Sequence, residues 1–445
     1  MEWSKYNYIY HSSKHGYLLF NTLSGTFLDI NNDSLRSTLF KIKENINEFD
    51  FSNKKKFKDL LLSSAIICER DTYNTSLSKF YALLGRFDGY ERILTILPTL
   101  NCNLACPYCY EGTNLRNDKM NVEVIAKLKD YIKEQYYQKI KLLKLQWYGG
   151  EPLLAFDVIQ DISSYLTELQ IPYAASIVTN ATLLTKDKIE FLSKLKINEI
   201  QVTLDGVKQT HDTKRIYKSS QGTFDVITNN LRILHQYIEQ NRQDIKVNIR
   251  VNIDKNNKDE YHVVQKFIYD EFPKFVVYPG ILMQYTTCSS SIPCFIDQKE
   301  VASFYIEQYE KYSVTELQFY PFLKGMRNCM AESPYTDMVG PKGEMYLCLK
   351  DVGDKNEEIG SIFSGKTNIH LISSYCNGGL TFDDKTCSDC MVIGLCGGGC
   401  ANIKYRNNKY QEKNDPCVPY KDMAILEKYL DIHYEIIKHS AEDDE

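Results

Sequence analysis

Between residues 93 and 285, the hydrophobic positions alternate between two periods. Short runs with an apolar residue at every second position, such as Val247, Ile249, Val251 and Ile253, predict β-strands. Longer stretches with apolar residues three and four positions apart predict helices. The predicted strands are 93–97, 143–147, 174–179, 199–204, 247–253 and 275–283, and the predicted helices are 122–135, 154–169, 186–195, 223–240 and 260–272. This alternation predicts parallel strands with crossover helices.

The fold class predicted for this region is α/β, with six strands and five connecting helices, which is close to six strand–helix units. Right-handed crossovers curl such units into a partial (β/α)6 barrel, whereas eight units would close it. Six units leave a lateral opening, which suits a large substrate. In such sheets the chemistry lies at the carboxyl ends of the strands.

The segments on either side of the barrel differ from it in pattern. Three short strands and two helices predict a small N-terminal α+β module, with strands at 8–10, 17–20 and 26–30 and helices at 34–46 and 54–63. The C-terminal part is rich in Cys and Gly and ends in a helix predicted at 420–437. We therefore expect four parts: 1–88, a barrel at 89–285, a bridging region at 286–328 and a cysteine-rich domain at 329–445.

Composition and charge narrow the classes of function. The 445 residues are 43% hydrophobic and 25% charged, and the net charge of -5 gives nucleic-acid binding no global electrostatic support. The first residues lack the pattern of a signal peptide, and no apolar run approaches the roughly 20 residues of a membrane helix. We expect a cytoplasmic protein that binds neither nucleic acid nor membrane.

The fourteen cysteines are grouped rather than scattered. Three lie within 102–109, and five of the last six lie between 376 and 400. A reducing cytosol disfavours so many disulfides, and clustering at short intervals is typical of metal ligation. Buried core thiols are the plainer alternative, which the spacing disfavours.

The first group, Cys102, Cys106 and Cys109, has the spacing C-x3-C-x2-C directly after the first barrel strand. Three thiolates at this spacing can hold one corner of a four-iron–four-sulfur cluster and leave the fourth iron open. Zinc is the alternative, but structural zinc sites usually take four ligands in two pairs.

This motif, in its barrel context, resembles that of the radical S-adenosylmethionine superfamily. The resemblance implies that the open iron chelates S-adenosylmethionine, whose reductive cleavage gives a 5′-deoxyadenosyl radical. It also implies that Tyr108, the aromatic residue before the third Cys, packs near the adenine.

Further matches to the superfamily occur at the ends of the second and third strands. Gly149, Gly150 and Glu151 follow the second strand, where glycines allow close approach to a ligand and Glu151 can accept a hydrogen bond from an ammonium group. Asn180 closes the third strand. The superfamily often has Gly after that Asn, but this chain has Ala181.

The fourth and fifth strands carry the remaining candidates. Thr203 and Asp205 lie where superfamily members bind the ribose hydroxyls, although Asp205-Gly206 also fits a plain turn. Arg215 resembles the arginine that pairs with the cosubstrate carboxylate. Arg250 lies among apolar strand residues, so we expect it to be paired, either in a structural salt bridge or with the cofactor.

A second cysteine motif lies near the C-terminus. Its members are Cys329, Cys348, Cys387, Cys390, Cys396, Cys400 and Cys417, with Gly343 in a G-x4-C spacing before Cys348. This order resembles the seven-cysteine SPASM domain, and a zinc ribbon is the alternative. The resemblance implies two auxiliary four-iron–four-sulfur clusters, which makes three clusters in all.

The SPASM resemblance also implies how the thiols divide. Cys387, Cys390, Cys396 and Cys417 would ligate the outer cluster, and Cys329, Cys348 and Cys400 the inner cluster. Seven thiols cannot fill eight positions, so either another Cys closes the inner cluster or its fourth iron is open to substrate. The spare candidates are Cys288, Cys294 and Cys376.

Within this group, chains with a small N-terminal module resemble ribosomal-peptide maturases, in which a winged-helix-like module binds the leader of a precursor peptide. We therefore expect an oxidoreductase-type enzyme that crosslinks such a precursor, through a thioether or a carbon–carbon bond, with electrons from a donor such as flavodoxin or ferredoxin. An anaerobic sulfatase-maturating, formylglycine-forming enzyme is one alternative. A non-catalytic peptide-binding scaffold is another.

Overall fold

The computed structural model describes residues 1–109, 111–112, 117–284, 292–317, 329–378 and 384–443. The chain forms two compact units. The first, here called the barrel unit, comprises Asp88–Asp297 and Ser333–Tyr375. The second, here called the flanking unit, comprises Met1–Phe87, Gln298–Glu332 and Cys376–Glu445. The four functional parts expected from the sequence follow different boundaries and stay a prediction.

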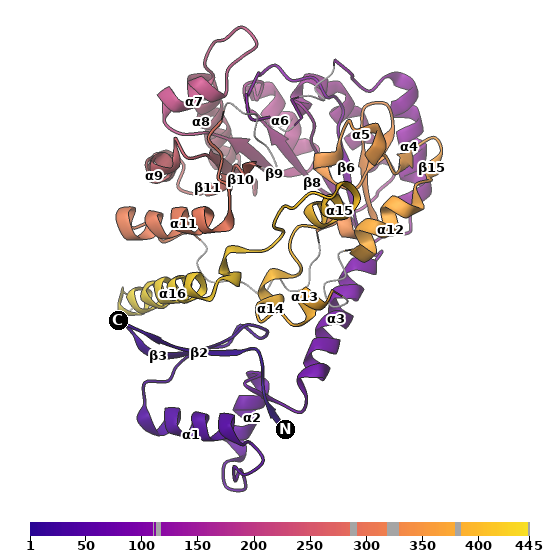
Figure 1. Ribbon diagram of the computed structural model, residues 1–445. Helices are drawn as coiled ribbons and strands as arrows, with labels where there is room; N and C mark the ends of the chain where they lie inside the picture. Colours follow the sequence, from indigo (N-terminus) through magenta and orange to yellow (C-terminus); the bar gives the residue numbers. More distant parts are fainter. Residues whose placement is uncertain (110, 113–116, 285–291, 318–328, 379–383, 444–445) are drawn as a thin grey trace. The chain divides into compact units, whose positions relative to one another are not determined.

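The barrel unit is built on six parallel strands that lie side by side in chain order (Figure 1). They are β6 (Glu91–Ile96), β7 (Leu142–Trp147), β8 (Tyr173–Thr179), β9 (Ile197–Thr203), β10 (Lys246–Ile253) and β11 (Val276–Ile281). Each strand predicted from the hydrophobic alternation is confirmed, and no strand end differs from its predicted position by more than two residues. Such parallel pairing brings all six carboxyl ends to one edge of the sheet.

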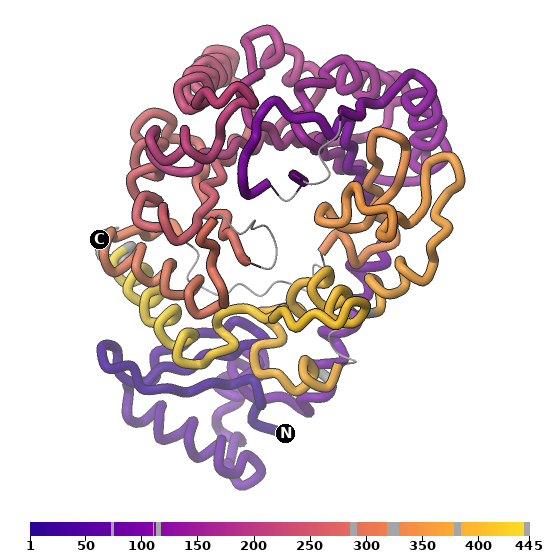
Figure 2. Tube along the Cα trace, turned by 45° about the horizontal axis from the view of Figure 1, so that its top comes forward, coloured from indigo at the N-terminus to yellow at the C-terminus, as the bar shows by residue number. Residues whose placement is uncertain are grey.

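Crossover helices connect these strands. They are α4 (Val122–Tyr136), α5 (Phe156–Glu168), α6 (Lys186–Lys194), α8 (Phe224–Asn241) and α9 (Tyr261–Glu271), and a short additional helix, α7 (Lys208–Lys214), precedes α8. Their apolar stripes lie against the sheet, which is the arrangement that the helical periodicity predicts. The segment between β6 and α4, dark purple in Figure 2, lies on the inner side of this curved array.

Four further strands extend the sheet beyond β6. Strand β12 (Thr336–Val339) pairs with β6 in parallel, and β13 (Glu344–Tyr346), β14 (Gly360–Ser361) and β15 (Gly365–Lys366) follow in antiparallel order. The hydrophobic pattern did not predict this extension, because strands of two to four residues are too short to show a period. The first half of the cysteine-rich region thus completes the barrel sheet.

In the flanking unit, a three-stranded sheet lies between helices (Figure 1). Its strands β2 (Asn7–Ser12), β3 (Gly16–Asn21) and β4 (Phe27–Asp29) pair in antiparallel order. Leu19 faces the hydrophobic cluster with α1 (Asp33–Glu44) and α2 (Lys55–Ser63), whereas Leu18 and Phe20 face α16 (Met423–Asp443). The alternation of strand side chains therefore joins the two ends of the chain in one core.

The other elements of the flanking unit are short, except for two long helices. The long ones are α3 (Asp71–Phe87) and α11 (Gln298–Tyr312); the others are β1 (Glu2–Trp3), β5 (Ile67–Cys68), α13 (Lys385–Ser388), α14 (Ile393–Cys396) and α15 (Ala401–Tyr410), and α12 (Ile369–Gly378) begins in the barrel unit. Among the helices described, none is both long and apolar enough to span a membrane.

Candidate functional site

The loop with the first three cysteines begins where β6 ends, and backbone hydrogen bonds hold it from two sides. The Glu151 amide donates to the Asn101 carbonyl over 2.9 Å, and the Ala105 amide donates to the Ile216 carbonyl over 2.9 Å. The loop is thus fixed between the segment after β7 and the segment after α7. This position at the carboxyl edge of the sheet is the one that the sequence predicted.

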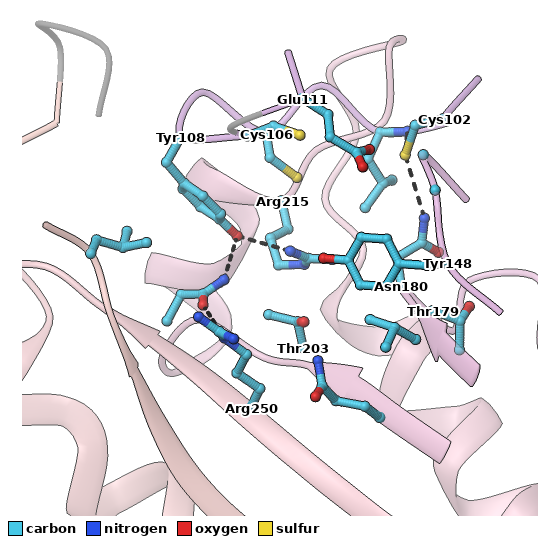
Figure 3. A pocket seen from close by; sticks show the side chains of 18 residues that line it. Cys102, Cys106, Tyr108, Glu111, Tyr148, Thr179, Asn180, Thr203, Arg215 and Arg250 are labelled. Atoms are coloured by element: carbon cyan, nitrogen blue, oxygen red, sulfur yellow. Dashed lines mark hydrogen bonds between the residues drawn. The ribbon is translucent and has the colours of Figure 1, made fainter. Parts of the chain in front are cut away.

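A single pocket gathers most of the residues that the sequence singled out (Figure 3). Its lining includes the predicted residues Cys102, Cys106, Tyr108, Cys109, Gly149, Gly150, Asn180, Thr203, Arg215 and Arg250. Glu151 and Asp205 are outside this lining and reach the pocket through other side chains. The three thiols and both arginines therefore surround one cavity.

The two glycines lie against the cysteine loop. An ideal Cβ on Gly149 would be 2.4 Å from the Thr99 carbonyl oxygen, and one on Gly150 would be 2.4 Å from the Asn101 carbonyl oxygen. Gly149 also has a φ of +117°, a backbone conformation that residues with a side chain rarely adopt. The sequence assigned these glycines to close approach by a ligand. In the structure, their α-carbons also make room for the backbone of the cysteine loop.

Glu151 is completely buried and joins the ends of two strands. Its carboxylate accepts hydrogen bonds from the Leu153 amide at 2.9 Å, the Thr179 hydroxyl at 2.7 Å and the Asn180 amide at 2.7 Å. These donors compensate for the cost of burying the carboxylate. The contact of Glu151 with an ammonium group of a cosubstrate stays a prediction.

Tyr108 is at the centre of a buried polar network on one side of the pocket. Its hydroxyl donates to the Asp205 carboxylate and accepts from Arg215 Nη1 at 2.8 Å and from Asn252 Nδ2 at 3.3 Å. Arg215 Nε has no hydrogen-bond partner among the residues that the structure describes. The network thus holds a buried cation at the cavity with a donor to spare, as recognition of a carboxylate requires.

Arg250 is held above a glycine of the adjacent strand. Its Nε donates to Asn252 Oδ1 over 2.9 Å, and an ideal Cβ on Gly280 would be 2.3 Å from the same Nε. Strand β11 pairs with β10 so that Gly280 is opposite Asn252. The absence of a side chain at Gly280 therefore leaves the space that the Arg250 side chain occupies.

The donor set of the pocket fits an iron–sulfur cluster. Burial raises the pKa of the Cys102 thiol to about 11 and that of Cys109 to about 12, so binding iron as thiolates must displace protons. Among the residues described, the one group of three candidate ligands with all atoms within 4.8 Å is Glu2, Cys68 and Asp71. The three pocket thiols are thus more widely spaced than ligands around one zinc ion.

Four polar or aromatic lining residues were not found from the sequence: Glu111, Tyr148, Gln201 and Asn252. Two of them had a detectable signal, since Gln201 is two positions before Thr203 and Asn252 two positions after Arg250, and alternate strand residues share a face. Burial raises the pKa of Glu111 to about 7, and its Oε1 has no hydrogen-bond partner in the described part of the chain.

A second cavity, within the flanking unit, is lined by all four thiols predicted for the outer cluster, Cys387, Cys390, Cys396 and Cys417. Gly397, Gly398 and Gly399 all have positive φ, and an ideal Cβ on Gly399 would be 2.2 Å from the Pro416 carbonyl oxygen. The triple glycine thereby allows the segment before Cys417 to approach the segment after Cys396.

The inner-cluster cysteines are divided between the two units, with Cys348 in the barrel unit and Cys329 and Cys400 in the flanking unit. The Cys329 amide donates to Glu332 Oε2 over 3.1 Å, which fixes its backbone. Their joint cluster stays a prediction.

The spare thiols differ in state. Cys294 is buried and disulfide-bonded, a state in which its sulfur cannot ligate iron. Cys376 is buried and forms no disulfide among the described residues, and Cys288 lies outside the described residues. The identity of the fourth ligand of the inner cluster therefore stays a prediction.

Comparisons with known proteins agree with this geometry. Residues 96–268 match the model of the Radical SAM superfamily. The chain is 24% identical over 339 residues to a cysteine-type anaerobic sulfatase-maturating enzyme of Clostridium novyi, covering 69% of this chain and 87% of the relative. It is 20% identical over 487 residues to the radical SAM cyclopropyl synthase TigE of Paramaledivibacter caminithermalis, covering 99% and 98%.

A solved structure shows the same fold. Native anSMEcpe with bound AdoMet and the Cp18Cys peptide superposes with a TM-score of 0.57 at 18% identity, covering 80% of this chain and all of that one. The parallel partial barrel and the three-thiol pocket define a class of enzymes that use S-adenosylmethionine with a four-iron–four-sulfur cluster. The protein is a radical S-adenosylmethionine enzyme, similar to the SPASM-containing sulfatase-maturating enzymes and peptide maturases.

Proposed function

We propose that the protein is a peptide maturase that installs a crosslink, thioether or carbon–carbon, in a ribosomally made precursor. The observation that carries this proposal is that one chain combines three features: a pocket lined by three thiols, a separate cavity lined by four thiols, and an N-terminal sheet module. The similarity to a cyclopropyl synthase along 99% of the chain, N-terminal module included, supports it. Because such a crosslink forms with the loss of two hydrogen atoms from the peptide, the bond-forming step is an oxidation of the peptide.

We assign the radical cluster to Cys102, Cys106 and Cys109. When bound, the cluster and S-adenosylmethionine supply reductive carbon–sulfur cleavage and a radical that abstracts hydrogen. The chain itself positions the cosubstrate. Arg215 presents a buried cation for the carboxylate, held in place by the Tyr108 hydroxyl, while Arg250, within β10, lines the same pocket. Tyr108 and Arg215 are buried, so this contact is shielded from solvent.

The N-terminal module is the proposed site for the leader. Its sheet has the order β2-β3-β4, with α1 and α2 on one face and α16 on the other, so both faces are covered. Strand β4 is an edge strand of this sheet in the described part of the chain, with Asp29 exposed. An extended leader can pair with such an edge through main-chain hydrogen bonds.

The outer auxiliary cluster is assigned to Cys387, Cys390, Cys396 and Cys417, which line one cavity. Together with an inner cluster, it would take the surplus electron from the oxidised peptide and pass it to a carrier such as flavodoxin or ferredoxin. Sulfatase maturation is the second candidate, favoured by the 24% identity to a sulfatase-maturating enzyme. A scaffold role would leave the pocket thiols without a purpose.

The test uses small peptides encoded beside this protein, incubated with the reconstituted enzyme, S-adenosylmethionine and dithionite. Mass spectrometry should show loss of two hydrogen atoms for each crosslink, with fragmentation blocked between the linked residues. Resistance of a peptide Cys to alkylation identifies a thioether, whereas a reactive Cys identifies a carbon–carbon bond. Conversion of a Cys or Ser to an aldehyde would establish sulfatase-type chemistry instead.

The leader role has its own measurement. Deleting residues 1–87, the N-terminal part of the flanking unit, should weaken binding of the precursor while the barrel still cleaves S-adenosylmethionine without a substrate. Substituting Asp29 by Pro in the full-length chain removes one main-chain donor from β4 and should weaken binding without deleting the module. Unchanged precursor affinity in both variants would refute leader binding at this module.

A further inference from the structure

Two lysines donate to sulfurs in the four-thiol cavity of the flanking unit. Lys404 Nζ is 3.5 Å from Cys387 Sγ, and Lys421 Nζ is 3.3 Å from Cys417 Sγ. Both distances are within hydrogen-bonding range for sulfur, and both lysines line the cavity with the four cysteines. The two cations thus contact two different members of the proposed ligand set of the outer cluster.

The chain fixes each lysine by a separate local element. The Lys404 amide donates to the Cys400 carbonyl over 3.1 Å at the start of α15, so the side chain leaves the helix within its first turn. The Lys404 side chain is 12% exposed and is 3.9 Å from Asp384 Oδ2. Lys421 ends a 3-10 turn four residues after Cys417 and is exposed. One cation is therefore largely buried beside the cavity, and the other faces solvent.

We propose that Lys404 and Lys421 are positioning residues that raise the reduction potential of the outer auxiliary cluster. This inference rests on the proposed function, because it requires that Cys387, Cys390, Cys396 and Cys417 hold a cluster. Reduction adds one electron to a centre that already has four thiolate ligands. Hydrogen bonds to the sulfurs and nearby positive charge stabilise the reduced form more than the oxidised form.

The expected size follows from the geometry. A charge-assisted hydrogen bond contributes more than a neutral one, and the shielded position of Lys404 reduces solvent screening. Asp384, close to both Lys404 and Cys387, opposes part of the effect. We expect removal of Lys404 to shift the ratio of reduced to oxidised cluster about tenfold at a fixed potential, or about 59 mV for one electron. Lys421, which is solvated, should give a smaller shift.

The experiment is a redox titration followed by electron paramagnetic resonance. It uses the full chain with Cys102, Cys106 and Cys109 replaced by Ala, so that only auxiliary clusters remain. The outer-cluster signal is assigned as the one that Cys387→Ser changes. Lys404→Met and Lys421→Met should each lower its midpoint potential, and the double variant should lower it further, with the iron content unchanged.

Two controls separate tuning from general effects. Lys385→Met removes a cation from an exposed position on α13, the helix that also carries Cys387, and should leave the potential unchanged. Lys421→Arg keeps a cationic N–H donor and should restore most of the shift.

The possible results distinguish this inference from the assignment of the cluster. If Cys387→Ser changes neither iron content nor any signal, then the proposed ligand set is wrong. If the cluster is present but both Met variants keep the wild-type potential, or Lys385→Met lowers it equally, then the role of the two lysines is refuted.

Discussion

His211 lies in α7, between Asp205 before the helix and Arg215 directly after it, and its ring is completely buried. Its Nδ1 accepts from the Asp205 amide at 3.2 Å, and its Nε2 is 3.0 Å from the Thr223 hydroxyl oxygen. The Thr223 hydroxyl donates to the Arg215 carbonyl, so Nε2 must donate to Thr223 and the ring must be neutral. Protonation of Nδ1 would place its N–H against the N–H of Asp205, so that two donors would face each other.

The structure gives the size of the pH effect. Burial, with the Arg215 charge as a further cause, lowers the pKa of His211 from 6.5 to about 3. Because the pKa is depressed in the folded state, the stabilising contribution is present above the unfolded-state pKa and is lost as the pH falls from about 6.5 towards 3. At about pH 5, protonation of the ring shifts the folding equilibrium of this segment towards the unfolded state by about 30-fold, or roughly 2 kcal/mol.

Hydrogen–deuterium exchange of peptides covering residues 204–215 measures this loss. We compare wild type with His211→Asn, whose side-chain oxygen can still accept from the Asp205 amide but does not titrate. Between about pH 7.5 and pH 5, wild-type protection should fall about 30-fold more than protection of the variant, after correction for intrinsic exchange. Equal falls in both proteins would refute the assignment of His211 as a buried neutral acceptor.

Two substitutions test the contacts that hold the two motifs. Gly150→Ala should lower stability by roughly 1–3 kcal/mol and reduce iron in the first cluster, because its Cβ would meet the Asn101 backbone; Gly89→Ala, whose Cβ would be 3.5 Å from Tyr335, is the control for thermal unfolding and iron analysis. Arg86→Met leaves the buried Glu332, its partner at 3.3 Å, without that cation and should cost about 3–5 kcal/mol in denaturant unfolding. Adding Glu332→Gln should restore part of this loss, and no restoration would contradict the pairing.

The barrel was predictable because its buried parallel strands and amphipathic helices have clear periods. Strand β10 is an example, with apolar residues at alternate positions from Val247 to Ile253. Strand β12 was not predictable, because its four residues gain their place from pairing with β6, far away in sequence. The sequence analysis also did not predict helix α3. Four of its apolar side chains have helical spacing but are exposed: Leu77, Phe80, Tyr81 and Leu84.

For the site, sequence reasoning found the residues better than their partners. Tyr108 and Arg215 were identified by motif, but the hydroxyl–guanidinium contact between them depends on tertiary structure over 107 positions. Glu151 was assigned to a ligand, whereas the structure shows three donors from the chain itself. Lys404 had no sequence signal, because its approach to the Cys387 sulfur arises from the packing of α15 beside α13.

The assignment of the radical cluster to Cys102, Cys106 and Cys109 is the central claim, and iron content measured together with 5′-deoxyadenosine production tests it most directly. Reconstituted wild type should hold about twelve irons, as expected for three four-iron clusters, and should form 5′-deoxyadenosine from S-adenosylmethionine and dithionite. The variant with all three cysteines replaced by Ala should lose about a third of the iron and form none. Cys68→Ala, outside both motifs, should match wild type. Wild-type iron and 5′-deoxyadenosine in the triple variant would contradict the account.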